Sequence, residues 1–508
     1  MSSLFSKTVP LALFVLGLQC FVSCSKDWAE LSGDNSKESG WVSFSINLPT
    51  PLSTNPDGGP TTRAAANSVA NGNTGDTYVG NVSDRVIKSM VVIIYNNGGD
   101  FVTSFSIGAS DVVGNSFASN PLKVKARKLK EGNYDVLVVA NPSQFITTCI
   151  SNHQPLSVVT GAANVASLTE LLPNNSITMC PREVAPLVNW RIYDTKAKAE
   201  NDPVAVTLER AVAKIFVSPS ANNTVPAPNA AGGRATVIEY SLRGVNKSMY
   251  YVRRPNLALK TNGTATTDAV LTSENKFTPE NNRYSVDPNM SKLTDAALTS
   301  QFGVNDSPKS GGWADDKGIF ATENTVNADN QQMNQLTHVL VKLKYIPKGL
   351  PANTTTWAYY KGVYMDYATL ESKYKAARKD NTTDELMDMP SGWKTTVTEL
   401  YNNSVKVNPT APSFDRYGLK FFQGGYSYYL VPIRHFDDTQ QPKLNAYGRY
   451  GVVRNHIYKI TINSVSRLGS PEPPIPTDEP ADQTPTFISA NVVVQNWSGV
   501  PLNKVTLE

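Results

Sequence analysis

The stretch WVSFSINL (residues 41–48) decides the fold class, because its large apolar residues alternate with small polar ones. An alternation with a period of two is the pattern of a β-strand that buries one face. The face predicted to be buried consists of Val42, Phe44, Ile46 and Leu48. We therefore expect the folded part of the chain to begin with a half-buried strand.

Similar strand patterns lie on both sides of a polar, charge-mixed stretch at 194–202. Before it they cover 89–95 and 134–140, and after it they cover 206–217, 235–242, 338–345, 426–433 and 454–465. Short helices are expected near 163–172 and at 366–379, and the long polar connection 260–328 is expected to lie on the surface as loop. The sequence therefore predicts an all-β protein with two β-sandwich domains and few short helices.

Length and charge narrow the function classes. The 508 residues exceed the usual limit of one domain, about 250 residues, which favours two domains. The 47 basic and 43 acidic residues give a net charge of +4, with no concentrated basic face to neutralise phosphates. We expect no nucleic-acid partner.

The N-terminus has the composition of a secretory leader. Lys7 precedes the apolar run 9–22, which is too short for a membrane helix but typical of a signal peptide. The run ends in Phe21-Val22-Ser23-Cys24-Ser25, which is similar to a bacterial lipobox with Cys24 as the lipidated residue. A palmitate-type acyl chain there would anchor the precursor to a membrane surface. The alternative is an ordinary cysteine in a cleaved leader, and Cys20 is a weaker candidate because Gln19 is large.

A loop rich in proline and glycine follows the first strand. Residues 49–60 contain repeated breakers of regular structure and lead to Arg63 and Ala64. Exposed loops of this kind are the preferred sites of proteolysis. We predict cleavage between Arg63 and Ala64, which would separate the first strand from the rest of the chain.

The C-terminus combines a proline-rich spacer with one more alternating segment. Six prolines in 469–486 predict an extended, semi-rigid spacer. A strand beyond an already complete domain could pair with another copy by donor-strand exchange. We therefore expect the segment 487–508 to replace the first strand of a neighbouring molecule, through Ile488, Ala490, Val492, Val494 and Trp497. For Trp497 the alternative is packing within its own chain.

Two cysteines, Cys149 and Cys180, remain after the leader. In an exported protein they would form one disulfide or remain as two buried thiols, and the sequence leaves both open.

An enzyme is the alternative from another class. The histidines at 153, 338, 435 and 456 are scattered and have no metal-ligand spacing. In His435-Phe436-Asp437-Asp438 a solvated loop is favoured over a metal site, and for Glu209 and Arg210 a cross-strand charge pair is favoured over catalysis. We expect no enzyme activity, no metal and no cofactor.

Several segments resemble the Bacteroidetes-type fimbrillins of the type V pilus, especially their Mfa-type shaft subunits. The resemblance is carried by the lipobox, by 206–214 (VTLERAVAK), by 453–458 (VRNHIY), and by 492–497 (VVVQNW) after the proline-rich spacer. It implies two transthyretin-like β-sandwich domains, an outer-membrane lipoprotein precursor, maturation by an Arg-specific or trypsin-like protease, and a fimbrium built from copies of itself and related subunits. Three alanines after Arg63 leave the identity of the protease open.

These expectations define a domain map. It consists of signal peptide 1–23, propeptide 24–63, N-terminal sandwich 64–200, C-terminal sandwich 201–468, spacer 469–486 and donor segment 487–508. The rival interpretation is a tip or accessory adhesin, or a non-polymerising surface lipoprotein that binds glycan or protein. An extra C-terminal strand favours the shaft subunit, because a terminal tip subunit only has to accept a strand.

Overall fold

The computed structural model describes residues 39–48, 77–78, 84, 86–117, 119–161, 165–181, 184–219, 224–227, 233–252, 260–261, 264–265, 302–326, 331–379, 384–435, 450–484, 486 and 488–497. The expected lipidation and processing positions, Cys24, Arg63 and Ala64, lie outside the described residues, as do Phe487 and 498–508. Within the described parts of the chain, no helix is both long and apolar enough to cross a membrane.

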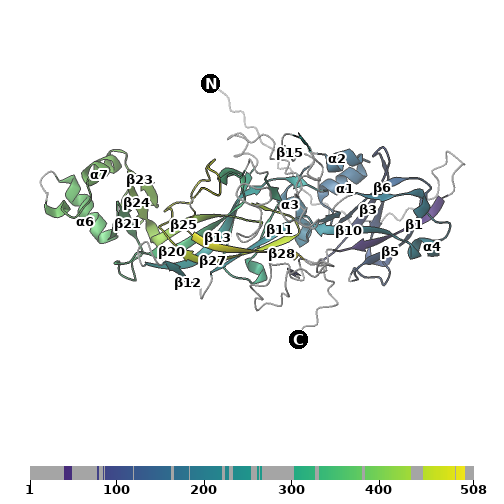
Figure 1. Cartoon of the computed structure of the whole chain (residues 1–508), viewed down its shortest axis with the longest axis horizontal. Helices are drawn as coiled ribbons and strands as arrows, with labels where there is room; N and C mark the ends of the chain where they lie inside the picture. Colours follow the sequence, from purple (N-terminus) through teal and green to yellow (C-terminus); the bar gives the residue numbers. More distant parts are fainter. Residues whose placement is uncertain are drawn as a thin grey trace, which may run out of the picture. The chain divides into compact units, whose positions relative to one another are not determined.

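The first sheet has eight strands, in the order β4-β3-β6-β8-β10-β1-β5 with β9 paired to β6 (Figure 1). The strands are β1 (Ser39–Asn47), β3 (Met90–Asn96), β4 (Phe101–Ile107), β5 (Leu122–Lys130), β6 (Tyr134–Ala140), β8 (Met179–Pro181), β9 (Ala185–Leu187) and β10 (Val204–Arg210). Since β10 pairs with both β1 and β8, the strand that follows the charge-mixed stretch belongs to this sheet.

Both faces of the first sheet are buried at strands β3 and β6. In β3, Val92 and Ile94 point into one core, while Val91 and Ile93 point into another. This explains the continuous apolar run of β3, because a strand covered on both sides has no polar face. The second core contains residues of α1 (Gln144–Ser151), α2 (Leu156–Thr160) and α3 (Leu168–Leu171).

We call the eight-stranded sheet, with the core that contains Phe44 and Val92, the first sandwich. Two further sheets form the second sandwich. One has the order β18-β11-β27-β28-β2, and the other has β12-β13-β20-β25 with β17 paired to β13. A single core lies between them, with Ile215, Tyr240 and Ile460 among its buried side chains. The strands are β2 (Thr77–Tyr78), β11 (Ala213–Pro219), β12 (Thr224–Ala227), β13 (Gly233–Asn246), β17 (Phe302–Lys309), β18 (Ile319–Ala321), β20 (His338–Ile346), β25 (Tyr426–Pro432), β27 (His456–Val465) and β28 (Ile488–Trp497). The predicted all-β class with two β-sandwiches is confirmed.

A small α/β unit is inserted in the second sandwich. Its sheet, β22-β21-β24-β23, packs with α6 (Tyr367–Arg378) and α7 (Trp393–Asn402) around a separate core. Its strands are β21 (Trp357–Tyr360), β22 (Val363–Asp366), β23 (Phe414–Arg416) and β24 (Leu419–Phe422). The predicted start of α6 at Asp366 is confirmed, and Asp366 caps the helix, because Thr369 N donates to Asp366 Oδ1 at 2.8 Å. Helix α7 was not predicted.

Two local predictions were wrong. The expected surface loop 260–328 includes β17 and β18, which pair with β13 and β11 and so belong to the second sandwich. The sequence of β17, FGVNDSPK, has few apolar residues, so no alternation indicated a strand. The expected helix 163–172 is reduced to α3, which follows the short strand β7 (Val165–Ala166).

The remaining elements are short. They are α4 (Lys196–Asn201), β14 (Met249–Tyr250), β15 (Lys260–Thr261), β16 (Thr264–Ala265), β19 (Asn324–Thr325) and β26 (Gly451–Val452).

Candidate assembly site

Strand β1 lies inside the first sheet and has a neighbour on each side. It runs antiparallel to β5, with seven residue pairs between 39–46 and 122–130 and a bulge at 42–44, and parallel to β10 through pairs such as Phe44 with Val204. Figure 1 shows β1 near β5 and β10. Removing β1 would therefore leave β5 and β10 with unpaired backbone groups facing one gap.

The apolar face of β1 is buried as predicted. Val42, Phe44 and Ile46 are 0% exposed and Leu48 is 5% exposed. Polar contacts add to this burial, since Ser43 Oγ donates to Val124 O at 2.7 Å and Leu48 N donates to Asn120 Oδ1 at 3.0 Å. The gap left by β1 would be a deep apolar groove in a sheet core.

Strand β28 pairs with other strands of its own chain. It pairs antiparallel with β27, from Val465 with Ile488 to His456 with Asn496, and its end pairs parallel with β2. Figure 1 shows β28 in yellow beside β27 and β11. The expectation that this strand is spare after a complete second domain is therefore corrected, because in this structure β28 is part of the second sandwich.

The alternation of apolar residues in β28 nevertheless predicts which of its side chains face the core. Ile488 is 6% exposed and belongs to the core of the second sandwich, and Ala490 and Val492 are partly buried against the same core. The side chain of Val494 lies outside the described residues. Trp497 packs within its own chain at 1% exposure, with its ring stacked on Phe320 at 6.2 Å.

Arg210 binds the end of β28. Its guanidinium donates to Trp497 O at 3.1 Å and lies 4.7 Å from the centre of the Trp497 ring. Its other contacts are Asn455 Oδ1 at 3.4 Å and Asp84 O at 2.9 Å. The cross-strand charge pair expected for Glu209 and Arg210 stays a prediction, while the Arg210 side chain, 0% exposed, binds three distant segments.

The proline-rich segment is attached to the second sandwich by backbone hydrogen bonds. Ser470 and Tyr428 exchange two backbone hydrogen bonds at 2.8 and 3.0 Å. Farther along, Asn334 N donates to Thr477 O at 2.7 Å and Ala481 N donates to Gln331 O at 2.8 Å. The segment is therefore a fixed strap rather than a free spacer.

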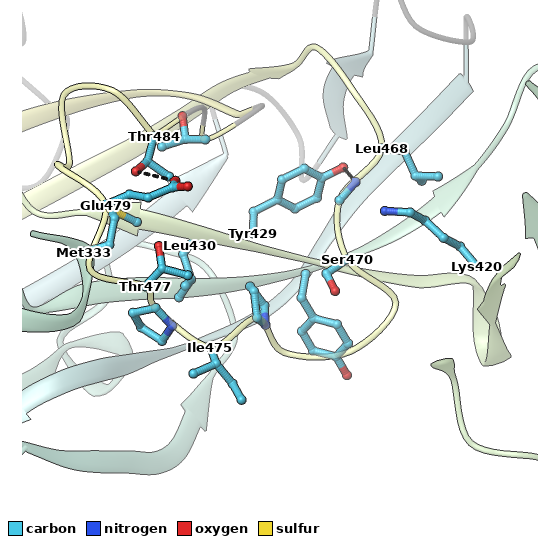
Figure 2. A pocket seen from close by; sticks show the side chains of 15 residues that line it. Met333, Lys420, Tyr429, Leu430, Leu468, Ser470, Ile475, Thr477, Glu479 and Thr484 are labelled. Carbon is cyan, nitrogen blue, oxygen red and sulfur yellow. Dashed lines mark hydrogen bonds between the residues drawn. The ribbon is translucent and has the colours of Figure 1, made fainter. Parts of the chain in front are cut away.

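A pocket of about 290 Å³ lies between this strap and β25. Figure 2 shows Leu430 of β25 beside Ile475 and Thr477 of the strap, whereas the ring of Tyr429 points toward the start of the strap. Tyr429 Oη accepts from Gly469 N at 2.9 Å, which fixes the start of the strap. Lys420, at the rim, forms an ion pair with Asp415 at 3.2 Å. The lining is mainly apolar and presents no acid–base pair suited to catalysis.

Cys149 and Cys180 are free and buried, which decides between the two alternatives for this pair. Burial raises the pKa of the Cys180 thiol to about 12 and also raises the pKa of Cys149. Neither is therefore an activated nucleophile.

The histidines hold structural positions in the described residues. His435 Nδ1 bonds Tyr458 Oη at 2.7 Å, His456 Nδ1 bonds Arg454 O at 2.8 Å, and His153 stacks on Phe101. Within the described part of the chain, no group of three His, Cys, Asp or Glu side chains is arranged to hold a metal ion. Residues 436–438 of the considered metal site lie outside the described residues.

Two protein-family models match the chain, one in the part that contains β1 and one in the part that contains β28. Residues 45–210, from within β1 to the end of β10, match the model of the major fimbrial subunit protein FimA. Residues 420–500, which include β25 to β28, match the model of the C-terminal part of fimbrillin, the major fimbrial subunit protein type IV. The chain is similar to fimbrial subunits. The predicted fimbrillin resemblance is thus confirmed, and such families imply assembly with other fimbrial subunits.

Solved structures of fimbrial proteins also match over most of the chain. A fimbrilin (FimA) from Porphyromonas gingivalis has 16% identity and a TM-score of 0.42, with 91% of this chain and 99% of that chain covered. The tip fimbrial protein Mfa3 from Porphyromonas gingivalis has 12% identity and a TM-score of 0.36, with 90% and 100% covered. No curated protein matches the sequence.

Sequence reasoning missed the contacts of Arg210 with Asp84 and Asn455. Arginine is rarely buried, so neither the residue type nor the strand pattern around Arg210 predicts that its side chain is buried. The signal that existed was the pair of segments 206–214 and 453–458, which the structure brings together at Arg210 and Asn455.

Proposed function

We propose that the chain is a shaft subunit of a cell-surface fimbrium, of the Mfa type, which polymerises when the strand β1 is replaced by the C-terminal segment of another copy. The observation that carries this proposal is the position of β1. It is an interior strand with a fully buried apolar face, and it precedes the segment that contains Arg63. One cut there would separate an essential strand from the body it completes.

The precursor would be exported by the signal peptide and anchored to the outer membrane by a lipid on Cys24. An Arg-specific or trypsin-like protease would then cut between Arg63 and Ala64. The cut would release lipid, tether and β1 together, so the subunit would pass from the membrane to the extracellular fimbrium. Its partners would be other copies and related fimbrial subunits.

The energetics favour a tight joint. Refilling the groove with four apolar side chains is worth roughly 6 to 12 kcal/mol, at about 1.5 to 3 kcal/mol each. Main-chain pairing to β5 and β10 adds about 1 kcal/mol for each hydrogen bond. Ordering a free segment offsets part of this gain.

The pairing of β28 with β27 leaves two donors within 487–508. If β28 itself is donated, it gives up its nine residue pairs with β27 and the burial of Ile488 and Trp497. If only 498–508 is donated, β28 keeps these pairs and remains as a fixed arm.

The pairing of β28 within its own chain also supports a second candidate function, which is a tip or accessory adhesin or a non-polymerising surface lipoprotein. A subunit of that kind accepts a strand or none, and so keeps its last strand in its own sheet.

The test is polymerisation of precursor without its leader after treatment with a trypsin-like protease. We expect SDS-resistant ladders at low temperature for the wild type and none for Arg63→Ala. A chain ended after Thr486 should also give none. A chain ended after Trp497 separates the donors, because ladders that persist assign donation to β28. If Arg63→Ala and the chain ended after Thr486 both form ladders, strand exchange is wrong.

A further inference from the structure

Three segments that are far apart in the sequence meet at one buried arginine. Arg210 is 0% exposed, and its side chain donates to the main-chain oxygens of Asp84 and Trp497 and to the side chain of Asn455. Asn455 O in turn accepts from Trp497 N at 3.1 Å. The end of β28 is therefore bound by Arg210 and Asn455, which also bind each other.

The segment that follows the expected processing site contacts the same cluster. Strand β2 pairs in parallel with the end of β28, Thr77 with Asn496 and Tyr78 with Trp497. Asp84 forms an ion pair with Lys214 at 2.9 Å, and both side chains are 3% exposed. Lys214 Nζ lies 5.0 Å from the ring centre of Phe320, which stacks on Trp497.

These contacts make residues 77–78 and Asp84 dependent on β28, and β28 dependent on them. A buried charge that loses one partner is strongly destabilised, because the interior does not replace the lost interaction as water would. Departure of β28 would remove the Trp497 carbonyl and ring from Arg210, and would leave β2 without a strand to pair with. Departure of Asp84 would remove one carboxylate from Lys214 and one acceptor from Arg210.

We propose that residues 77–78 and Asp84 form a latch that keeps β28 in its own sheet, with Arg210 as the group that both contact. The latch and β28 open together, in one step. The proposal deepens the proposed function and rests on it for its consequence: the segment just after the processing site controls when the C-terminal strand becomes available to another subunit.

The first test uses wild-type, uncut precursor without its leader. Native-state hydrogen exchange is measured by mass spectrometry over a series of low denaturant concentrations. Peptides that cover 77–84 and 488–497 should follow one common opening curve, at lower denaturant than peptides from β20. If either segment exchanges while the other stays protected, the latch is wrong.

The second test is a double-mutant cycle. Asp84→Asn removes the ion pair with Lys214, and a chain ended after Thr486 removes β28. Asp84→Asn should lower the Tm of the full chain at least twice as much as that of the shortened chain, because the shortened chain lacks Trp497, on which Phe320 beside Lys214 stacks. Equal shifts would overturn the coupling. The control is Asp388→Asn, whose ion pair with Lys373 lies in the small α/β unit and should give equal small shifts in both chains.

Both tests are made on the uncut monomer. If the two segments open together but no ladders form after cleavage, the latch is supported and strand exchange is wrong. If ladders form but the two segments open separately, strand exchange is supported and the latch is wrong.

Discussion

Strands β1 and β28 have the same alternating pattern but differ in what surrounds them. β1 lies between two neighbours, and three of its side chains are 0% exposed. β28 has one long neighbour, β27, and a two-residue contact with β2, and its Ala490 and Val492 are only partly buried. Both strands lie one position from the end of their sheets, but the outer neighbour of β28 is only two residues long, so β28 can leave at a smaller loss of free energy. This difference supports the proposal that β1 is replaced and that the C-terminal region is donated.

The largest expected effect is on β1. Phe44→Ala should lower the free energy of unfolding of the first sandwich by about 3 to 5 kcal/mol, because it opens a cavity in a packed core. Urea unfolding followed by hydrogen exchange in β3 and β6 measures this. The control is Val102→Ala in the edge strand β4, where a 37% exposed side chain should contribute less than about 0.5 kcal/mol. Equal effects of the two variants would contradict the interior position of β1.

Acid should weaken the sandwich that contains β28. Burial lowers the pKa of His338, at the start of β20, to about 4. Since this lies below the unfolded value of about 6.5, the unfolded chain binds the proton first, and stability is lost as the pH falls from about 6.5 to 4. The loss between pH 7 and pH 4.5 should be about 2 to 3 kcal/mol.

The measurement is hydrogen exchange of β20 at both pH values, corrected for the intrinsic rates. His338→Leu should remove this part of the pH dependence, and the difference between variant and wild type cancels the contribution of the carboxylates. An unchanged pH dependence in His338→Leu would show that the imidazole is not its source.

A smaller effect should follow from crowding at the start of β1. A Cβ at Gly40 would lie 2.6 Å from Ile192 Cγ2 and 2.8 Å from Tyr193 O, so Gly40→Ala should destabilise the first sandwich by about 1 to 3 kcal/mol. Gly108→Ala is the matched control, because its nearest contact is at 3.6 Å. Thermal unfolding of both variants checks this, and a neutral Gly40→Ala would mean that β1 is loosely held at its start.

The smallest effect is expected in β28. Val492→Ala removes two methyl-sized groups from a partly buried position and should lower stability by about 1 kcal/mol. The comparison with Phe44→Ala, under the same urea unfolding conditions, is the useful quantity. A loss as large as that of Phe44→Ala would place β28 among the indispensable strands and argue against donation.

The sequence predicted what depends on local pattern. The alternation in 41–48 identified the buried face of β1, and Asp366 identified the start of α6. It did not predict α7, whose first turn follows Gly392 in a left-handed conformation rather than a side-chain cap. It also did not predict that β28 pairs with β27, because the choice between two sheets depends on contacts distant in sequence. The burial of Arg210 is of the same kind, since only the meeting of 84, 455 and 497 satisfies its charge.

The central claim is that the groove of β1 accepts a C-terminal segment. Dilute full-length subunit, cut after Arg63, is mixed with a synthetic peptide of residues 487–508, and the fragment that contains β1 is followed by native mass spectrometry. The account predicts that the peptide displaces this fragment and remains bound one to one. A peptide with asparagine at every Val, Leu and Ile position should fail to displace it. Retention of the β1 fragment at a large excess of the unaltered peptide would contradict the account.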